Sequence, residues 1–142
     1  MTAKCKNTQT PLHRAEEEEV ALLLLKHGAD ANALDIKNRT PLHIVSELGR
    51  VRAARVLLEH GDGVDANARD ANSATPLHLA SGPKFMDTIG RHLDVVRLLL
   101  QYGSDIHAVD DKGQTPFMRA RAKKYHEMMQ LLLEHGAEDR RV

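Results

Sequence analysis

Four clusters of aliphatic residues divide the chain, and a glycine follows each of them. In the third cluster, "DVVRLLL" at residues 94–100, the apolar positions follow helical spacing and form a wide stripe on one side. Glycine readily adopts the left-handed conformation that ends many helices. The pattern therefore predicts four amphipathic helices, which end near four glycines: Gly28, Gly61, Gly103 and Gly136.

A shorter helix is predicted ahead of each of these, because threonine followed by proline recurs before every cluster. The threonine hydroxyl can accept a hydrogen bond from a free N–H at a helix start, and proline fits the first helical position. A polar stretch rich in Asp and Asn follows each glycine and is typical of a turn or hairpin. Neither helix of a pair can bury its apolar face alone, so the pairs must stack. The four helix starts are Thr10, Thr40, Thr75 and Thr115.

The motif itself is "TPLH" in three copies and "TPFM" in the last. This chain resembles the ankyrin-repeat proteins, whose unit is about 33 residues with a T-P-L-H-x-A signature. The resemblance covers roughly residues 5–139 and implies an all-α solenoid of stacked helix-turn-helix pairs, L-shaped, with projecting β-hairpin loops. It also implies that His13, His43 and His78 form hydrogen bonds between neighbouring loops. We expect one domain, 1–142, with repeats at about 5–34, 35–69, 70–109 and 110–142, the last also acting as a C-terminal cap.

The repeats differ in length only where the stack is not packed. From threonine to glycine, the second and fourth units span 22 residues, whereas the first spans 19 and the third spans 29. The seven extra residues of the third unit lie between its two helices, and we assign the insert to about residues 82–90. Two further residues follow Gly61 in "GDGVDAN". Inter-helix turns and hairpins tolerate such changes, so we expect fixed helix pairs with variable loops.

Composition narrows the choice of partner and compartment. The 142 residues carry 20 basic and 20 acidic side chains, and a neutral balance does not favour nucleic acid. Aromatic residues make up 3%, so the core must consist of Leu, Val and Ala. Cys5 is the only cysteine, which indicates a reducing compartment, cytoplasmic or nuclear. No apolar run is long enough to span a bilayer, and we expect a monomeric domain that does not insert into membranes.

The histidines and acidic residues do not form a catalytic or metal-binding pattern. "HEMMQ" at residues 126–130 lacks the second histidine of the zinc-protease motif. Six of the nine histidines belong to the repeat signature or precede a helix-ending glycine. We therefore expect no enzyme activity, no cofactor and no metal. Glu16–Glu19 form either a solvated helix start or an acidic docking patch. Asn32 and Asn67 either stabilise turns or, by the resemblance, are positions where asparagine can be hydroxylated in animals.

The resemblance implies a protein-interaction module that binds a partner protein on its concave face, formed by loop tips and first helices. Ile36 and Leu48 are apolar at exposed positions, and are either anchors for a partner or ordinary scattered aliphatics. The candidate positions on the loop tips are Ile36, Lys37, Arg39, Ala71, Asn72, Ala74, Asp111, Lys112 and Gln114. The candidate positions on the first helices are Glu47, Leu48, Ala122 and Lys123.

The insert of the third repeat is a further candidate, with Lys84, Phe85, Met86 and Ile89. These residues either anchor a partner or fold back over the helix pair and cover the core. Two alternative functions stay open. One is a small inhibitor or regulator that occludes an enzyme. The other is a phosphate or nucleic-acid contact through the basic fourth repeat, where the polar, basic helix otherwise serves as a cap. Its basic residues could also hold an acidic partner, and they are Arg119, Arg121, Lys123 and Lys124.

Overall fold

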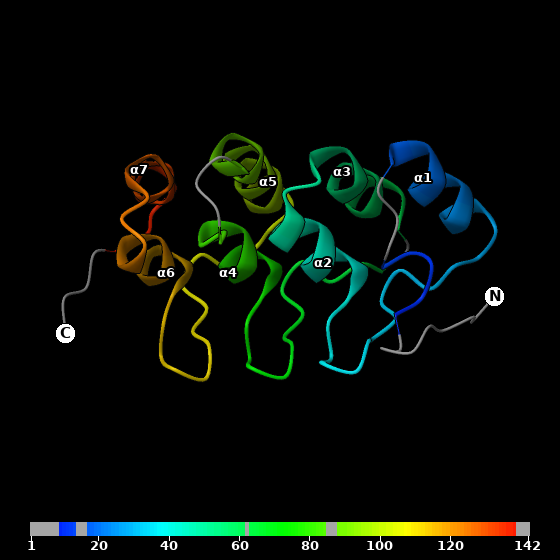
Figure 1. The fold of residues 1–142 in the computed structure, drawn as a ribbon, viewed down its shortest axis with the longest axis horizontal. Helices are drawn as coiled ribbons and strands as arrows, with labels where there is room; N and C mark the ends of the chain where they lie inside the picture. Colours follow the sequence, from blue (N-terminus) through cyan, green and yellow to red (C-terminus); the bar gives the residue numbers. More distant parts are fainter. Residues whose placement is uncertain (1–8, 14–16, 62, 85–87, 139–142) are drawn as a thin grey trace.

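The computed structural model describes residues 9–13, 17–61, 63–84 and 88–138, and in this part of the chain seven helices form two rows (Figure 1). The outer row is α1 (Glu18–Lys26), α3 (Val51–His60), α5 (Ile89–Gln101) and α7 (His126–Glu134). The inner row is α2 (Pro41–Leu48), α4 (Pro76–Ser81) and α6 (Pro116–Ala122). Loops project from the inner row on the side away from the outer helices (Figure 1). The predicted all-α solenoid of stacked helix pairs is confirmed.

The three inner helices begin at the predicted threonines. The side chains of Thr40, Thr75 and Thr115 each accept a hydrogen bond from a backbone N–H three residues later, and proline is the first helical residue. In α2 and α4 that third residue is a histidine, whose ring in turn accepts the threonine N–H. The reciprocal pair satisfies two N–H groups that a helix start otherwise leaves without a partner.

All four outer helices end within two residues of the predicted glycines, and three of these glycines adopt the left-handed conformation. Gly28, Gly103 and Gly136 have φ values of 84°, 90° and 99°, in the left-handed region. At the fourth, Gly61, α3 ends as predicted but the left-handed conformation is wrong, because Gly61 is extended with φ of −79°. Gly63, in the two-residue extension of that loop, adopts the left-handed conformation instead, with φ of 67°. The extra residues therefore move the turn further along the chain.

The core lies between the two rows, and leucine, valine and alanine make up most of it. Two larger side chains, Phe117 and Met128, are also fully buried in the last helix pair. Phe117 stands where the other repeats have leucine, so this departure from the motif keeps an apolar contact in the stack. The fully buried leucines come from successive repeats: Leu12, Leu42, Leu57, Leu77, Leu99 and Leu132.

The first repeat departs from the predicted helix pair. Among its described residues, Pro11–His13 form a turn closed by a hydrogen bond of 3.0 Å from the His13 N–H to the Thr10 carbonyl. The described helix of this repeat is α1, which starts within the glutamate run. Glu17, Glu18 and Glu19 are exposed around that start, which fits both a solvated helix beginning and an acidic docking patch.

Part of the insert in the third repeat is helical. Ile89 and Gly90, which we assigned to a loop, form the first turn of α5. As a result, α5 has 13 residues, whereas α3 has 10 and α1 and α7 have nine each. Phe85 and Met86 lie outside the described residues, so their two alternative roles stay untested. The insert thus lengthens an outer helix as well as the turn before it.

Candidate functional site

Each projecting loop is organised by one aspartate. In the loop between α1 and α2, the carboxylate of Asp35 accepts hydrogen bonds from the N–H groups of Lys37 and Arg39, at 2.8 and 2.9 Å. Burial alone would raise the pKa of Asp35, but these N–H donors, together with the Gln9 amide and the Arg39 charge, outweigh it and the pKa is lowered. Asp70 and Asp110 make the equivalent contacts in the next two loops. The loops are hydrogen-bonded turns, and no residue that the structure describes is assigned to a β-strand.

Neighbouring loops are joined to one another by the signature histidines. The His43 Nε2 atom donates to the Ala74 carbonyl at 2.9 Å, while Nδ1 accepts from the N–H of Thr40 at 3.1 Å. His13 and His78 make equivalent contacts, with the threonine N–H of their own repeat and with a carbonyl of the following repeat, that of Arg39 or Gln114. The predicted role of these three histidines is confirmed.

These contacts define the protonation state of the histidines. A neutral ring with its proton on Nε2 satisfies both the carbonyl acceptor and the N–H donor. Burial lowers the pKa of His43 below 6.5 and outweighs the opposing effect of the Ala74 carbonyl. The pKa values of His13 and His78 are lowered for the same reason. We call these three histidines and the loops that they connect the loop ladder. The loop ladder therefore stabilises the fold most strongly while its histidines are neutral.

Two asparagines join the turns that follow the outer helices. The Asn32 amide donates to the Gly63 carbonyl at 2.8 Å, and the Asn67 amide donates to the Gly103 carbonyl at 3.1 Å. Each side-chain oxygen also accepts an N–H from the following repeat, that of Asp65 or Asp105. The turn-stabilising interpretation of these asparagines is thus confirmed.

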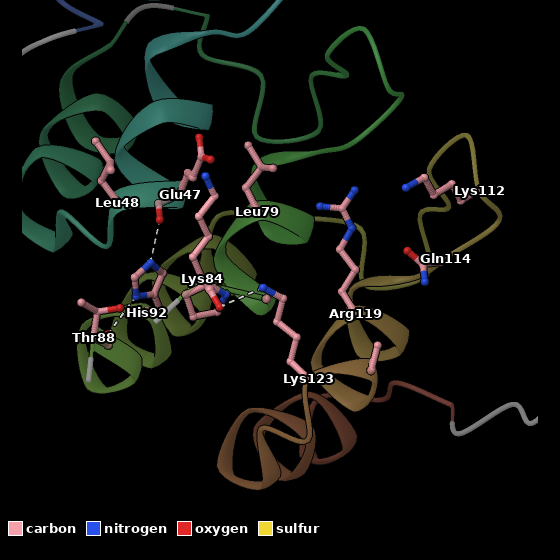
Figure 2. Close-up of a pocket in the computed structure, with 13 residues that line it drawn as sticks. Glu47, Leu48, Leu79, Lys84, Thr88, His92, Lys112, Gln114, Arg119 and Lys123 are labelled. Carbon is pink, nitrogen blue, oxygen red and sulfur yellow. Dashed lines mark hydrogen bonds between the residues drawn. The ribbon is translucent and has the colours of Figure 1, made fainter. Parts of the chain in front are cut away.

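A groove lies between the inner helices and the last projecting loop (Figure 2). Its cavity volume is about 630 Å³. Apolar side chains of the lining come from α2, α4 and the base of the insert, and four basic side chains also contribute to it. The lining residues are Glu47, Leu48, Leu79, Gly82, Pro83, Lys84, Thr88, His92, Lys112, Gln114, Arg119, Ala122 and Lys123.

The groove contains seven of the residues predicted from sequence to face a partner. These seven are Glu47, Leu48, Lys84, Lys112, Gln114, Ala122 and Lys123. Two other candidates lie outside the lining. Arg39 is half-buried and forms ion pairs with Asp35 and Glu47, at 2.9 and 3.4 Å. Ile89 is half-buried against the core. The loop-tip candidates Ile36, Lys37, Ala71, Asn72 and Asp111 are exposed outside this lining.

One candidate does not present its side chain to the surface. Ala74 is 1% exposed, and its carbonyl already accepts the hydrogen bond from His43. It belongs to the loop ladder because the chain turns inward there, immediately before the threonine that starts α4. We therefore remove Ala74 from the candidate contact residues.

The sequence alone places Arg119 in a basic helix but does not show that its side chain lies at the groove wall. Its guanidinium Nε and Nη2 donate to the same carboxylate oxygen of Asp110, at 3.1 and 2.8 Å, and this holds the arginine at the groove wall. Arg121 lies over the Phe117 ring at 5.9 Å, and Lys124 occupies a left-handed turn with φ of 60°.

His92 is not among the residues that the sequence predicts to be functional, although it ties the insert to the second repeat. The ring is buried, and its nitrogens lie 2.8 Å from the carbonyl oxygens of Glu47 and Thr88. A Cβ atom on Gly49 would lie 2.8 Å from the His92 ring, so the ring packs directly on this glycine. Figure 2 shows both hydrogen bonds at one end of the groove. No local sequence signal distinguishes this histidine from an ordinary core residue of the helix.

The described residues include no group of three or more His, Cys, Asp or Glu side chains that could hold a metal ion. In the same part of the chain, no helix is both long enough and apolar enough to cross a membrane.

The fold and its loop ladder define a helical repeat protein in which the second, third and fourth units each add one projecting loop and one helix pair. Two overlapping segments, residues 16–106 and 63–141, match a family model described as ankyrin repeats (3 copies). Together these segments cover most of the chain, so it belongs to the ankyrin-repeat family. Ankyrin repeats are protein-interaction modules.

The curated relatives are much longer than this chain. NF-kappa-B inhibitor alpha of Gallus gallus is 34% identical over 139 residues, which cover 95% of this chain and 43% of the relative. E3 ubiquitin-protein ligase KEG of Arabidopsis thaliana is 35% identical over 134 residues, covering 90% of this chain and 8% of the relative. An ankyrin repeat protein of fowlpox virus is 30% identical over 117 residues, covering 80% and 18%. The chain therefore spans less than half the length of each of these proteins.

Proposed function

We propose that this chain is a non-catalytic binding module that holds a partner protein in the groove between its inner helices and projecting loops. The groove itself is the observation that carries the proposal, because one concave surface combines apolar side chains with several charged ones. Such mixed concave surfaces suit binding, in which apolar contacts supply affinity and polar contacts supply orientation. The loop ladder supports this role because it holds the groove wall in place before any partner arrives.

A regulator that occludes the active site of an enzyme or another functional surface is the second candidate. It is favoured by the similarity to a protein named as an inhibitor, which extends over 95% of this chain. A passive adaptor would leave the activity of its partner unchanged, whereas an occluding regulator would lower it. Measuring the activity of a captured partner with and without this chain separates the two. We also propose a cytoplasmic or nuclear location and a monomeric state.

Two matched variants test whether the groove binds a partner. Leu48 ends α2 in the groove and is 44% exposed, and Leu133 lies in the last turn of α7 outside it and is 45% exposed. Leu48→Gln and Leu133→Gln therefore remove similar exposed apolar surface at similar positions in a helix. Partners are captured from the source cells with wild-type protein and both variants, and are quantified by mass spectrometry.

We expect proteins that are retained by wild-type protein and by Leu133→Gln but are depleted with Leu48→Gln. Each such protein is then purified and titrated against the three forms, to show that the contact is direct. Equal capture by all three forms, or equal loss in both variants, would rule out the groove as the binding surface.

A further inference from the structure

The charges of the groove are not balanced, although the whole chain is neutral. Lys84, Lys112, Arg119 and Lys123 line it, from the insert base, the last loop and α6. Among the described residues, Glu47 is the only acidic side chain of the lining. No acidic side chain among the described residues forms an ion pair with any of the three lysines. The groove therefore presents a local excess of positive charge.

The acidic groups nearby already have basic partners. Glu47 pairs with Arg39 at 3.4 Å, and the buried carboxylate of Asp110 pairs with Arg119 at 2.8 Å. Asp111, beside Lys112 at the loop tip, is exposed outside the lining. Glu47 and Leu48 lie at one end of the groove, and Lys84 extends toward Glu47, whereas Arg119, Lys112 and Lys123 lie toward the other end (Figure 2). The positive charge is thus concentrated toward the fourth repeat.

Between the cations the groove is apolar. Leu79 from α4, Pro83 at the insert base and Ala122 at the end of α6 contribute there, and Leu48 continues the apolar surface toward the second repeat. Lysine stems add to such a surface while their ammonium groups stay in water. The arrangement suits a segment that carries carboxylates on either side of an apolar side chain.

The cationic end is fixed in position before binding. The Lys123 ammonium and the Tyr125 hydroxyl both donate to the carbonyl of Pro83, at 3.2 and 2.6 Å. These bonds tie the fourth repeat to the start of the insert, directly before Lys84. Asp110 orients Arg119 in the same way. Fewer groups have to be ordered when a partner binds, and this favours affinity.

We propose, on the basis of the function proposed above, that this groove binds an acidic segment of a partner protein. Carboxylates of the segment meet Lys84, Lys112 and Lys123, and an apolar side chain between them packs on Leu79 and Pro83. Nucleic acid fits less well, because no Phe, Tyr or Trp among the described residues lines the groove for bases to stack on, and the His92 ring is buried. The separation of the cations on different elements also favours several carboxylates over one compact phosphate.

The chain offers a matched pair of lysines for the test. Lys112 and Lys37 occupy the same position in their loops, three residues before the threonine that starts the next helix. Both are exposed, but Lys112 lines the groove and Lys37 does not. Random peptides are displayed on phage and selected on the full chain as wild-type protein, Lys112→Glu, Lys37→Glu and Leu48→Gln.

Peptides selected on the wild-type protein are expected to be enriched in Asp and Glu around one apolar residue. The same enrichment is expected with Lys37→Glu and is lost with Lys112→Glu. For a synthesised winning peptide, fluorescence anisotropy should show binding about tenfold weaker to Lys112→Glu, as for reversal of an exposed ion pair, and weaker binding as salt rises. Circular dichroism confirms that each variant is folded.

Several outcomes would overturn the inference. Selected peptides without an acidic excess that depend on Leu48 would leave the groove as a binding site and refute its acidic preference. Selection that yields no peptide, or peptides indifferent to Leu48→Gln, would refute both this inference and the proposed function. Displacement of the peptide by inorganic phosphate or a single-stranded oligonucleotide at equal charge would show a general anion site.

Discussion

Replacing His43 by alanine should remove the central connection of the loop ladder. The ring accepts the Thr40 N–H at 3.1 Å, contacts the Thr40 hydroxyl at 2.9 Å and donates to the Ala74 carbonyl at 2.9 Å. Thr40 and Ala74 are 3% and 1% exposed, so neither group can turn to bulk water after the substitution. His43→Ala therefore leaves a buried donor and a buried acceptor without their partner.

The magnitude follows from these two groups. Leaving a buried polar group unsatisfied costs about 1–3 kcal/mol, so the pair costs about 2–6 kcal/mol. The space left by the ring adds a cavity contribution. We expect His43→Ala to lower the free energy of unfolding by about 3–5 kcal/mol, a large part of the 5–15 kcal/mol typical of a domain. The lost ring connects two repeats, so the effect should appear in global unfolding.

The assay is equilibrium unfolding in urea at about pH 7.5, followed by circular dichroism. His107→Ala is the control, because His107 is exposed on a loop and a surface substitution changes stability by about 0.5 kcal/mol or less. Equal destabilisation by the two substitutions would refute the assignment of His43 as a connection between repeats.

A pH series tests the same reasoning independently. The pKa of folded His43 lies below its ordinary 6.5, so between these values the unfolded chain binds more protons. The contribution of neutral His43 to the free energy of unfolding is therefore complete above pH 6.5 and is lost as the pH falls through the folded pKa. Each such histidine adds a slope of at most about 1.36 kcal/mol per pH unit. His43→Ala should reduce the slope, and an unchanged slope would contradict burial as its cause.

Three further substitutions test local contacts by the same unfolding assay. Gly49→Ala should destabilise by at least about 1–2 kcal/mol, because φ is 69° and the new Cβ would lie 2.8 Å from His92. Gly90→Ala should instead stabilise by about 0.5–1 kcal/mol, because alanine favours a helix over glycine and no described atom lies within 4 Å of the added Cβ. Tyr125→Phe should cost about 1 kcal/mol, because it removes the 2.6 Å hydrogen bond to the Pro83 carbonyl. Opposite signs for the two glycines are required.

Much of the groove could be anticipated from position within the repeat. Lys112 and Gln114 on a loop, and Glu47 and Leu48 at the end of a first helix, were placed on one surface by the repeat pattern and lie together in the structure. Arg119 could not be placed in this way. Its orientation depends on Asp110, which comes from the preceding loop and reaches it only when that loop folds against α6.

The two changes in repeat length also separate what the sequence pattern predicts from what depends on contacts between repeats. The pattern located the extra residues of the third repeat between its helices but could not predict that Ile89 would begin α5. Turn residues do not indicate whether adjoining residues will join a helix, because that depends on contacts across the stack. The packing of Ile89 against the core and the burial of His92 supply those contacts. In the second repeat, the longer loop moved the left-handed turn from Gly61 to Gly63.

The sequence by itself determined the order of helices, most of their starts and ends, and the repeat family, because these depend on contacts within a few residues. A threonine caps an N–H three residues later, and an apolar stripe needs only the period of the helix. Only the tertiary structure decided which charges gather in the groove and which candidate is buried. The contact from His92 to Glu47 spans 45 residues and that from Tyr125 to Pro83 spans 42. Such contacts form only when the repeats stack, and local residue preferences do not specify them.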